Sequence, residues 1–289
     1  MKSKDGARAP RSSAFLSRKL RGLESDIVET VPRVLGNKDG EAVHDLRVAI
    51  RRLRTLLRLA EPVFGRFHTA AVGRSFAALQ KATGDLRDEE ALEETLESLE
   101  VKDKDFDLWR ERRRGRARAL RRAVLRRLEG SELRRAKTLL RALLVLPVKP
   151  SRDEALARFA RRCISRARRR VDGLRDTETT DVEGMHALRI AYKKLRYAAE
   201  LLSEALPADL AAMGEPASRF QKRLGDIHDI DVALVTLGRA RGLTPETRGR
   251  VISELRDVRD RKVAKYVGEM SPAAAAETRA PIPLEPAAS

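Results

Sequence analysis

Leucine, alanine, valine and isoleucine recur at spacings of three and four residues along most of the chain, among arginine and glutamate. This spacing places the apolar side chains on one side of an α-helix and is typical of amphipathic helices. Alternating patterns that would indicate β-strands are nearly absent. The pattern therefore predicts an all-α protein.

Short breaks divide the pattern into about eleven helices, each of a length found in helical bundles. The breaks lie at Gly36–Gly40, Glu61-Pro62, Gly84-Asp85, Gly130-Ser131, Pro147–Ser151, Asp172–Asp181, Pro207, Gly225-Asp226 and Gly242–Pro245. At the two Gly-Asp breaks we expect a helix to end at glycine and the next to begin with an aspartate N-cap. Residues 1–11 and the Ala/Pro-rich residues 271–289 are expected to be disordered tails.

The chain contains an internal repeat. The segment VHDLRVAIRRLRTLLRLAE (43–61) aligns with MHALRIAYKKLRYAAELLS (185–203), and LQKATGDLRDEEAL (79–92) aligns with FQKRLGDIHDIDVA (220–233). The offsets agree within one residue, which indicates a tandem duplication. We expect one helical bundle from about residues 12–146 and a second from 151–270, with residues 131–146, which have no counterpart, forming a joining helix.

The helix expected around residues 42–60 carries two separate stripes of side chains. At about 100° per residue, its basic side chains fall within an arc of about 80°; they are His44, Arg47, Arg51, Arg54 and Arg58. The apolar side chains are centred about 120° away and are expected to face the core; they are Leu46, Ile50, Leu53, Leu57 and Ala60.

The second copy of the repeat has the same two stripes. Its basic side chains are His186, Arg189, Lys193 and Arg196, and its apolar side chains are Leu188, Tyr192, Leu195, Ala199 and Leu202. The copies differ at the far end, where Glu200 matches Arg58. Like charges at these spacings destabilise an isolated helix by a few tenths of a kcal/mol per pair. A repeated stripe without acids therefore indicates an anionic ligand, although a solvated basic face is the alternative.

Both histidines lie near the start of their expected helices. Thr180 and Glu183 fit a capping box before His186, and a turn at Asn37–Gly40 precedes His44. Helix N-termini favour phosphate because they offer free backbone N–H groups and a positive dipole end. The alternative is a histidine that packs against a neighbouring helix and hydrogen bonds to a carbonyl group.

The charge balance strengthens the case for an anionic partner. The 289 residues include 61 Lys plus Arg, most of them Arg, against 43 Asp plus Glu, which gives a formal net charge of +18. The planar guanidinium group of arginine binds phosphate oxygens in pairs. Further basic residues are candidate flanking contacts, with ion pairing or solvent exposure as the alternative for each; they are Arg18, Lys81, Arg114, Arg118, Arg121, Arg162, Arg166, Arg169, Lys222 and Arg223.

The two copies of H-x-x-R-[VI]-x-x-[RK]-[RK]-L-R, with the later G-D-x-[RH]-D blocks, resemble the CHAD family, named for a conserved-histidine α-helical domain. The resemblance spans about residues 12–270. It implies two four-helix bundles related by pseudo-twofold symmetry, and binding of inorganic polyphosphate along a basic surface, in some members at polyphosphate granules. The contacts that it implies in this chain are His44, Arg47, Arg51, Arg52, Arg54, Arg58, His186, Arg189, Lys193, Lys194 and Arg196.

Some features depart from the family pattern. Glu200 at the position that matches Arg58 implies a shorter site in the second copy, and Thr83 at the position that matches Leu224 implies altered packing. Some family members carry a triphosphate-processing barrel domain ahead of this one. Only a short tail is expected before residue 12, and no E-x-E-x-K run occurs. The resemblance therefore implies a binding protein that is not an enzyme and has no cofactor.

The segment GDIHDID (225–231) is the strongest candidate for catalysis. Asp226, His228 and Asp229 are residue types that bind metal ions in phosphohydrolases, so a metal-dependent phosphohydrolase is an alternative function. The other copy has Arg87 at the position of His228. Because arginine does not ligate metals, the repeat favours helix capping over a metal site. Cys163 is the only cysteine, and a partly buried thiol without catalytic function is expected.

Nucleic-acid binding is a further alternative, since phosphate contacts explain the positive charge equally well. Aromatic residues make up only 4% of the chain, which disfavours base stacking, and no nucleic-acid-binding signature occurs. We therefore expect polyphosphate as the ligand, held in a groove lined by both basic stripes, with weak nucleic-acid binding at most. No apolar run is long enough to span a membrane, membrane insertion is not expected, and the N-terminus is not typical of a secretion signal. The expected location is the cytoplasm.

Overall fold

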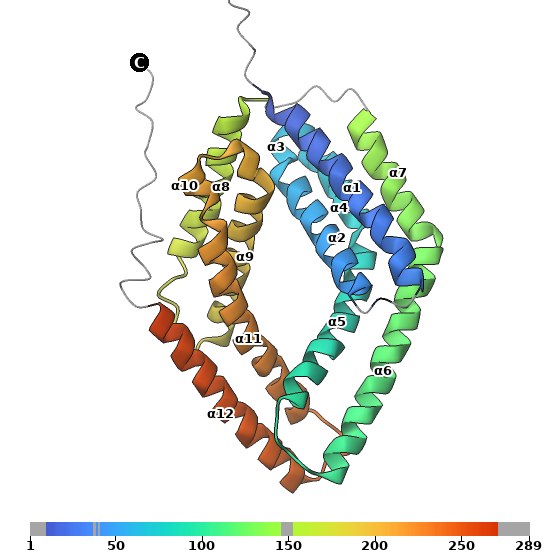
Figure 1. Cartoon of the computed structure of the whole chain (residues 1–289), viewed down its shortest axis with the longest axis vertical. Coiled ribbons are helices and arrows are strands. Elements are labelled where there is room, and N and C mark those ends of the chain that lie inside the picture. The colour runs from blue at the N-terminus through green and yellow to red at the C-terminus, as the bar shows by residue number, and fades with distance from the viewer. Residues whose placement is uncertain (1–9, 37–38, 40, 146–152, 271–289) are drawn as a thin grey trace, which may run out of the picture. The chain divides into compact units, whose positions relative to one another are not determined.

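The computed structural model describes residues 10–36, 39, 41–145 and 153–270, and these residues are almost entirely helical (Figure 1). The only β-type pairing among them is an isolated bridge between Arg11 and Ala155. The predicted all-α class is therefore confirmed. The helices are α1 (Ser12–Gly36), α2 (Ala42–Leu59), α3 (Glu61–Phe64), α4 (Arg66–Ser75), α5 (Ala77–Glu97), α6 (Lys104–Glu129), α7 (Ser131–Val145), α8 (Leu156–Asp172), α9 (Val182–Leu202), the 3-10 turn η1 (Ser203–Ala205), α10 (Ala208–Ala211), α11 (Gly214–Gly238) and α12 (Pro245–Glu269).

Most of the predicted breaks fall between helices. Helix α6 ends at Glu129 and α7 begins at Ser131, on either side of Gly130. Helix α12 begins with Pro245 at its first position, after the N-cap Thr244. These ends follow local chemistry, because proline lacks the N–H that a helix interior needs and threonine accepts a hydrogen bond from a free N–H group. The breaks at residues 37, 38 and 40 and at Pro147–Ser151 lie outside the described residues, as does most of the two predicted tails.

The prediction that helices end at the two Gly-Asp pairs is wrong. Helix α5 continues through Gly84 and α11 continues through Gly225. Glycine inside a helix costs only about 1 kcal/mol relative to alanine, and burial of apolar side chains on either side offsets this cost. Asp85 and Asp226 therefore lie within helices and do not cap them.

The N-cap of α9 lies one residue later than the predicted capping box. Asp181, not Thr180, accepts a hydrogen bond from the backbone N–H of Gly184, at 2.9 Å. A Cβ atom at position 184 would lie 2.3 Å from the Asp181 carboxylate and 2.5 Å from Thr177 Cγ2. Only glycine therefore allows this tight start to α9, which was not evident from the T-x-x-E pattern.

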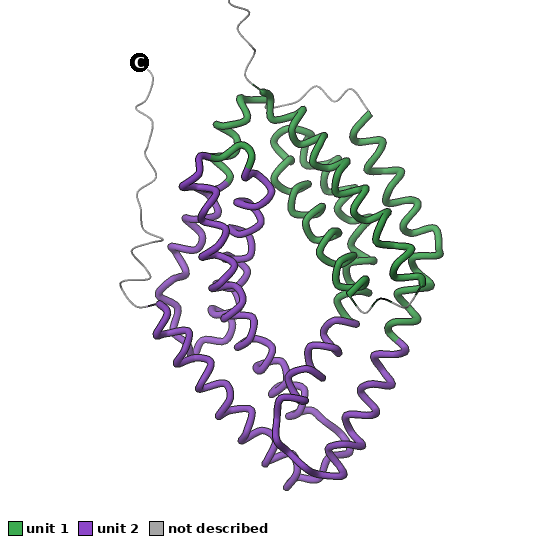
Figure 2. The backbone as a smooth tube through the Cα atoms, viewed as in Figure 1, with its two compact units in different colours: residues 1–85, 120–163, 204–206 green, residues 86–119, 164–203, 207–289 purple. Residues whose placement is uncertain are grey.

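The chain divides into two compact units (Figure 2). Unit 1 consists of Met1–Asp85, Leu120–Cys163 and Glu204–Leu206, and unit 2 consists of Leu86–Ala119, Ile164–Ser203 and Pro207–Ser289. The division falls inside α5, α6 and α8 and so does not coincide with the predicted repeat boundaries. The two predicted repeats and their pseudo-twofold symmetry stay predictions.

In unit 1, α1 packs along α2, and α4 packs against both α2 and α7. All five residues of the predicted apolar stripe on α2 are at most 1% exposed, which confirms that this stripe faces the core. Helix α7 buries Leu133, Ala136, Leu140 and Leu143. The segment predicted as a joining helix is therefore part of the core of unit 1.

The described part of the first predicted tail contacts the rest of unit 1. The Arg11 guanidinium lies 3.1 Å from the Asp153 carboxylate, and the N–H of Leu156 donates to the carbonyl of Pro10 at 2.9 Å. Pro10 and Arg11, which were predicted to belong to the first tail, thus contact the rest of unit 1.

In unit 2, α9 and α12 both pack against α11. The predicted apolar stripe on α9 is buried, and its Tyr192 contacts Phe220 of α11 with ring centroids 5.2 Å apart. A second core joins the unit 2 portions of α5 and α6 to α11 and α12, through residues that include Leu96, Phe106, Trp109 and Leu255.

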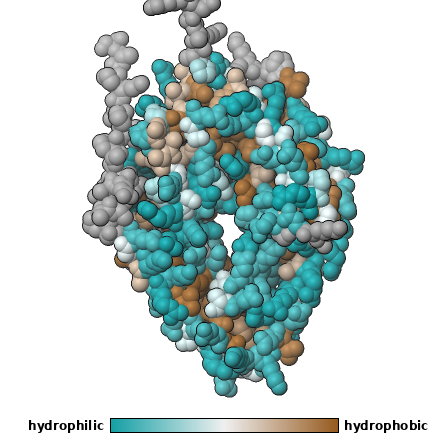
Figure 3. Space-filling model, viewed as in Figure 1, coloured by the Kyte–Doolittle hydropathy of each residue, from teal (hydrophilic) through white to brown (hydrophobic). Residues whose placement is uncertain are grey.

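Polar groups dominate the face of the molecule drawn in Figure 3. This is expected for a chain in which 36% of residues are charged. No helix in the described residues is long and apolar enough to span a membrane.

Candidate functional site

The α2 stripe consists of His44, Arg47, Arg51, Arg54 and Arg58, all in unit 1. His44 and Arg58 are exposed, and the three arginines between them are partly buried. The opposite side of the helix is packed into the core, so the basic groups can point only outward or along its flanks. The geometry of α2 thus matches the two-stripe prediction.

Arg54 and Arg58 form the best-defined part of the α2 stripe. Arg54 Nη1 donates a hydrogen bond to the side-chain carbonyl of Gln80 on α5, and Arg58 lies 3.4 Å from the Thr55 hydroxyl. Burial, and then the positive charge of Arg58, lower the pKa of the Arg54 guanidinium. Arginine nevertheless keeps its charge in proteins. Two like charges are therefore held together beside neutral hydrogen-bond acceptors, and an anion placed there would relieve their repulsion.

Arg52 lies in a different environment from the α2 stripe. It lines a pocket of about 350 Å³ between α1 and α2, together with the acidic residues Asp26, Glu29 and Asp45. These carboxylates compensate positive charge within the pocket. Of the six predicted contacts on α2, Arg52 therefore has the surroundings least suited to an anionic ligand.

The α9 stripe consists of His186, Arg189, Lys193 and Arg196, all in unit 2. His186 is exposed, as is the neighbouring Lys194, whereas the other three are partly buried. Arg196 Nε lies 2.6 Å from the Glu200 carboxylate, and its guanidinium lies 5.6 Å from the centre of the Tyr197 ring. Glu200 thus neutralises the end of this stripe, which supports a shorter site on α9 than on α2.

His228 of α11 extends the α9 stripe onto a second helix. The Nδ1 atoms of His186 and His228 are 3.4 Å apart, and their ring centroids are 4.7 Å apart. Burial, followed by the charges of Arg189 and His186, lowers the pKa of His228 to about 4. Burial, Arg189 and Lys193 also lower the pKa of His186. Both shifts favour the neutral rings. A neutral ring carries one N–H, so one ring donates and the other accepts in the Nδ1–Nδ1 hydrogen bond, and the accepting ring keeps an Nε2–H that can donate to a ligand.

The aspartates around His228 interact with basic residues. Asp231 lies 2.6 Å from Arg259 Nε, and Asp226 lies 3.4 Å from Lys262 Nζ. Burial raises the pKa of Asp229, while the positive charges of Arg189 and Arg87 oppose that shift. Within the described residues, no three His, Cys, Asp or Glu side chains are placed to share a metal ion. The acidic groups of GDIHDID therefore act within a charge network in unit 2.

Six of the ten predicted flanking residues have an acidic partner in the structure. The pairs are Arg18–Glu204, Lys81–Asp85, Arg114–Glu93, Arg118–Glu111, Arg162–Glu154 and Arg223–Glu269. Arg166, Arg169 and Lys222 are exposed, and in the described part of the chain they have no acidic partner. These three have the most suitable environment for a flanking anion contact, and Arg121 has a further interaction within the molecule.

Sequence reasoning did not include His228 and Asp229 among the binding residues. It treated them as a candidate metal site or as helix caps because the Gly-Asp pair resembled a helix end. The repeat gives a signal for the aspartates, because Asp85 and Asp88 match Asp226 and Asp229, but it gives none for His228, whose counterpart is Arg87. Residues three apart lie on one side of a helix. A continuous α11 therefore places both aspartates on the same side, where Asp226 pairs with Lys262 and Asp229 lies near Arg189 and Arg87.

The fold and these basic clusters define an all-helical protein with a strongly cationic, histidine-containing surface on α2 and again on α9. A family model for the CHAD domain matches residues 20–238. The chain therefore belongs to the CHAD domain family, which confirms the resemblance. CHAD domain proteins are linked to polyphosphate and are generally described as binding proteins.

Solved structures show the same fold. The crystal structure of the CHAD domain from the plant Ricinus communis is similar, with a TM-score of 0.71 and 23% sequence identity over 93% of this chain and 92% of that one. PptA from Streptomyces chartreusis is similar with a TM-score of 0.63 and 14% identity, over 90% of this chain and 99% of that one. A comparison with curated proteins finds no match.

Proposed function

We propose that this protein binds inorganic polyphosphate through the α2 and α9 stripes and does not catalyse a reaction. Family membership supports the ligand class, and the repeated arrangement of histidine and basic residues supports the site. We further propose a cytoplasmic location, associated with polyphosphate granules.

The observation that carries this proposal is the pairing of Arg54 with Arg58. Their hydrogen-bond partners are the neutral side chains of Gln80 and Thr55, so their positive charges are not compensated through these contacts. Arg54 is partly buried, and its hydrogen bond to Gln80 restricts its motion more than that of a fully solvated arginine. Two guanidinium groups one helical turn apart suit a ligand that carries closely spaced phosphates.

The binding mechanism follows from the charges. A polyphosphate chain releases bound counterions as basic residues neutralise its phosphates, and this release supplies much of the binding free energy. Arginines add orientation through paired hydrogen bonds to phosphate oxygens. Of the neutral pair His186 and His228, the ring that accepts the shared Nδ1 hydrogen bond keeps an Nε2–H, which can donate to phosphate without adding to the repulsion within the stripe.

A competition experiment measures which anion the protein prefers to bind. Unlabelled polyphosphate, duplex DNA or RNA is added to the complex of the protein with labelled long-chain polyphosphate, at matched phosphate concentration. The salt concentration is about 0.15 M, at which surface charges are screened beyond about 8 Å. We expect polyphosphate to compete best. Stronger competition by either nucleic acid would favour the nucleic-acid-binding alternative. Incubation with triphosphate and divalent metals should release no phosphate, and release would contradict a purely binding role.

Paired substitutions test the site. Arg54→Gln with Arg58→Gln on α2, and Arg189→Gln with Lys193→Gln on α9, are each expected to weaken polyphosphate binding about tenfold or more, because each removes two charge-assisted contacts. Combining the two pairs tests whether the stripes contribute independently, in which case their losses of binding free energy add.

The matched control removes the same charge elsewhere. Arg256 and Arg261 are exposed on α12, and Arg256→Gln with Arg261→Gln should change the affinity less than twofold, a difference of under about 0.5 kcal/mol. Circular dichroism checks that each variant is folded. Equal effects of the stripe pairs and this control would show that net charge alone causes binding.

A further inference from the structure

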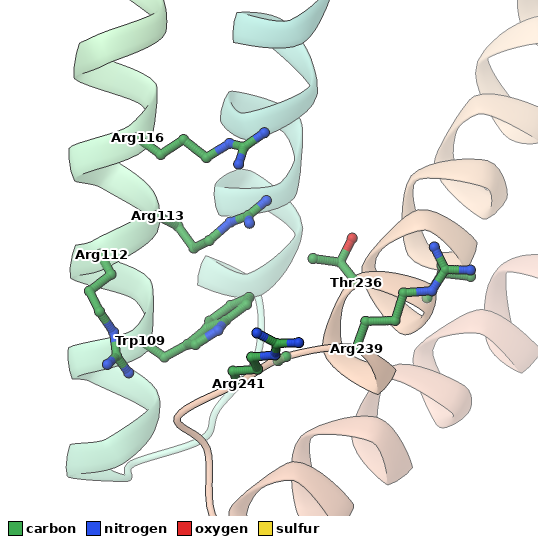
Figure 4. Close-up of a pocket in the computed structure, with 9 residues that line it drawn as sticks. Trp109, Arg112, Arg113, Arg116, Thr236, Arg239 and Arg241 are labelled. Carbon is green, nitrogen blue, oxygen red and sulfur yellow. The ribbon is translucent and has the colours of Figure 1, made fainter.

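Five arginines surround a pocket in unit 2 that shares no residue with the α9 stripe. The pocket has a volume of about 540 Å³ and is lined by α6 and by the end of α11 with the residues that follow it. Its arginines are Arg112, Arg113, Arg116, Arg239 and Arg241, and its lining contains no acidic residue. Figure 4 shows these side chains on both sides of the pocket.

The positive charge of this pocket is only partly neutralised. The Glu89 carboxylate, which does not line the pocket, pairs with Arg113 at 2.8 Å and Arg116 at 2.9 Å. Arg239 and Arg241 are exposed, and within the described residues neither has an acidic partner. Several guanidinium groups therefore remain available to an anion.

Arg112 is held by a backbone contact that depends on glycine. Its Nη2 donates to the carbonyl of Gly242 at 3.1 Å, and Gly242 has a φ of +82°. A Cβ atom at position 242 would lie 2.8 Å from Arg112 Nη2. Glycine adopts this φ readily and has no Cβ atom. The loop can therefore form its turn and leave room for the Arg112 guanidinium.

A second arginine fixes the same loop from the side of α12. Arg248 Nη2 donates to the carbonyl of Ala240 at 3.0 Å, and the Thr247 hydroxyl donates to the Asp103 carboxylate at 2.9 Å. The pocket is therefore organised before any ligand binds, which reduces the entropy lost on binding.

The pocket also has an apolar wall formed by Trp109, Val235 and Ala240. Trp109 is only 5% exposed and stacks against Phe106, with ring centroids 6.3 Å apart. A concave site of this volume, with charged groups converging beside apolar side chains, is typical of small-molecule sites. A multiply charged compact anion fits the chemistry better than an extended polymer.

We propose that this arginine pocket is a second ligand site, separate from the two stripes, for a compact di- or triphosphate group, either inorganic or carried by a nucleoside. The phosphates lie among Arg112, Arg239 and Arg241, and a nucleoside, where present, lies against the apolar wall. The assignment does not depend on polyphosphate binding by the stripes.

Trp109 is the only tryptophan of the chain, so its fluorescence reports on this pocket directly. Inorganic tripolyphosphate, pyrophosphate and adenosine triphosphate are titrated into the full-length protein, with calorimetry measuring the same affinities. We expect a change in Trp109 emission that saturates. Tighter binding of adenosine triphosphate than of tripolyphosphate would identify the nucleotide as the source of the phosphate group, and the reverse order would identify the inorganic anion.

Arg239→Ala with Arg241→Ala is expected to weaken tripolyphosphate binding about tenfold or more and to remove the emission change. Arg256→Ala with Arg261→Ala, which removes equal charge outside the pocket, should leave both unchanged. Arg189→Gln with Lys193→Gln should also leave the emission change intact while weakening long-chain polyphosphate binding. The inference is overturned if no oligophosphate alters the emission, if the pocket variant binds unchanged, or if the α9 variant alone removes the response.

Discussion

His228 shows how its surroundings determine the protonation of a single residue in this protein. Its ring is half-buried and lies near Arg189 and His186, and these effects lower its pKa from 6.5 to about 4. In the unfolded chain the ring regains its usual pKa. Between pH 6.5 and 4 the unfolded state therefore binds a proton that the native state does not, and native stability decreases as the pH falls through this window.

Replacing His228 with Gln should reduce this pH dependence. Between pH 7.5 and pH 5, His228→Gln is expected to lose less stability than the wild type, by about 1 kcal/mol after allowance for screening by water. Thermal unfolding at the two pH values measures the difference. His68→Gln, which changes an exposed histidine on α4, is the control and should behave as the wild type does. The same loss of stability in His228→Gln and in the wild type would contradict this role of burial.

At the scale of secondary-structure elements, ion pairs connect α5 to α6 within unit 2. Glu93 lies 2.6 Å from guanidinium nitrogens of both Arg110 and Arg114, and Glu89 pairs with Arg113 and Arg116. Glu89 and Glu93 belong to an acid-rich segment of the sequence, and their charges neutralise arginines on the next helix. Much of the arginine on this part of α6 is therefore structural.

Substituting Glu89 tests this helix pairing. The side chain of Glu89 is only 7% exposed, so Glu89→Ala leaves two guanidinium groups without their buried partner and is expected to destabilise the protein by about 2 kcal/mol. Glu94→Ala on the same helix is the comparison, because Glu94 is 62% exposed and pairs with Arg87 at the surface. It should cost less than about 1 kcal/mol. Denaturant unfolding that showed equal costs would argue against a structural role for the buried pair.

At the scale of the whole molecule, the net charge of +18 attracts anions of every kind and raises their local concentration. This long-range attraction is not selective. A binding site differs from this general attraction because particular residues neutralise a definite number of phosphates. The dependence of binding affinity on salt concentration measures that number.

The salt dependence of polyphosphate binding should therefore change when a stripe is altered. Arg54→Gln with Arg58→Gln is expected to reduce the slope of log affinity against log salt concentration by about 1.4, at about 0.7 per phosphate contact on a single strand. Fluorescence anisotropy over a series of salt concentrations gives the slope. The control pair on α12 should leave it unchanged, and an unaltered slope in the stripe variant would mean that these arginines do not touch phosphate.

Several features were determined by the sequence alone. The all-α class, most helix ends and the buried stripes of α2 and α9 follow from the spacing of apolar residues and from proline, glycine and capping residues. These signals act within a few residues, because a helix repeats every 3.6 residues and forms its hydrogen bonds locally. Periodicity therefore predicted Leu46 and Leu188 as core residues, and both are fully buried.

Other features were decided only by tertiary structure. Local chemistry at Gly84 and Gly225 favoured helix ends, yet packing on both sides continued α5 and α11 through them. The continuous α11 brings His228 to His186, 42 residues away in the chain. Similarly, Arg250 pairs with Asp103, 147 residues away. Charge neutralisation depends on distance in space and on burial, so only the folded chain determines which of its many arginines remain available to bind an anion.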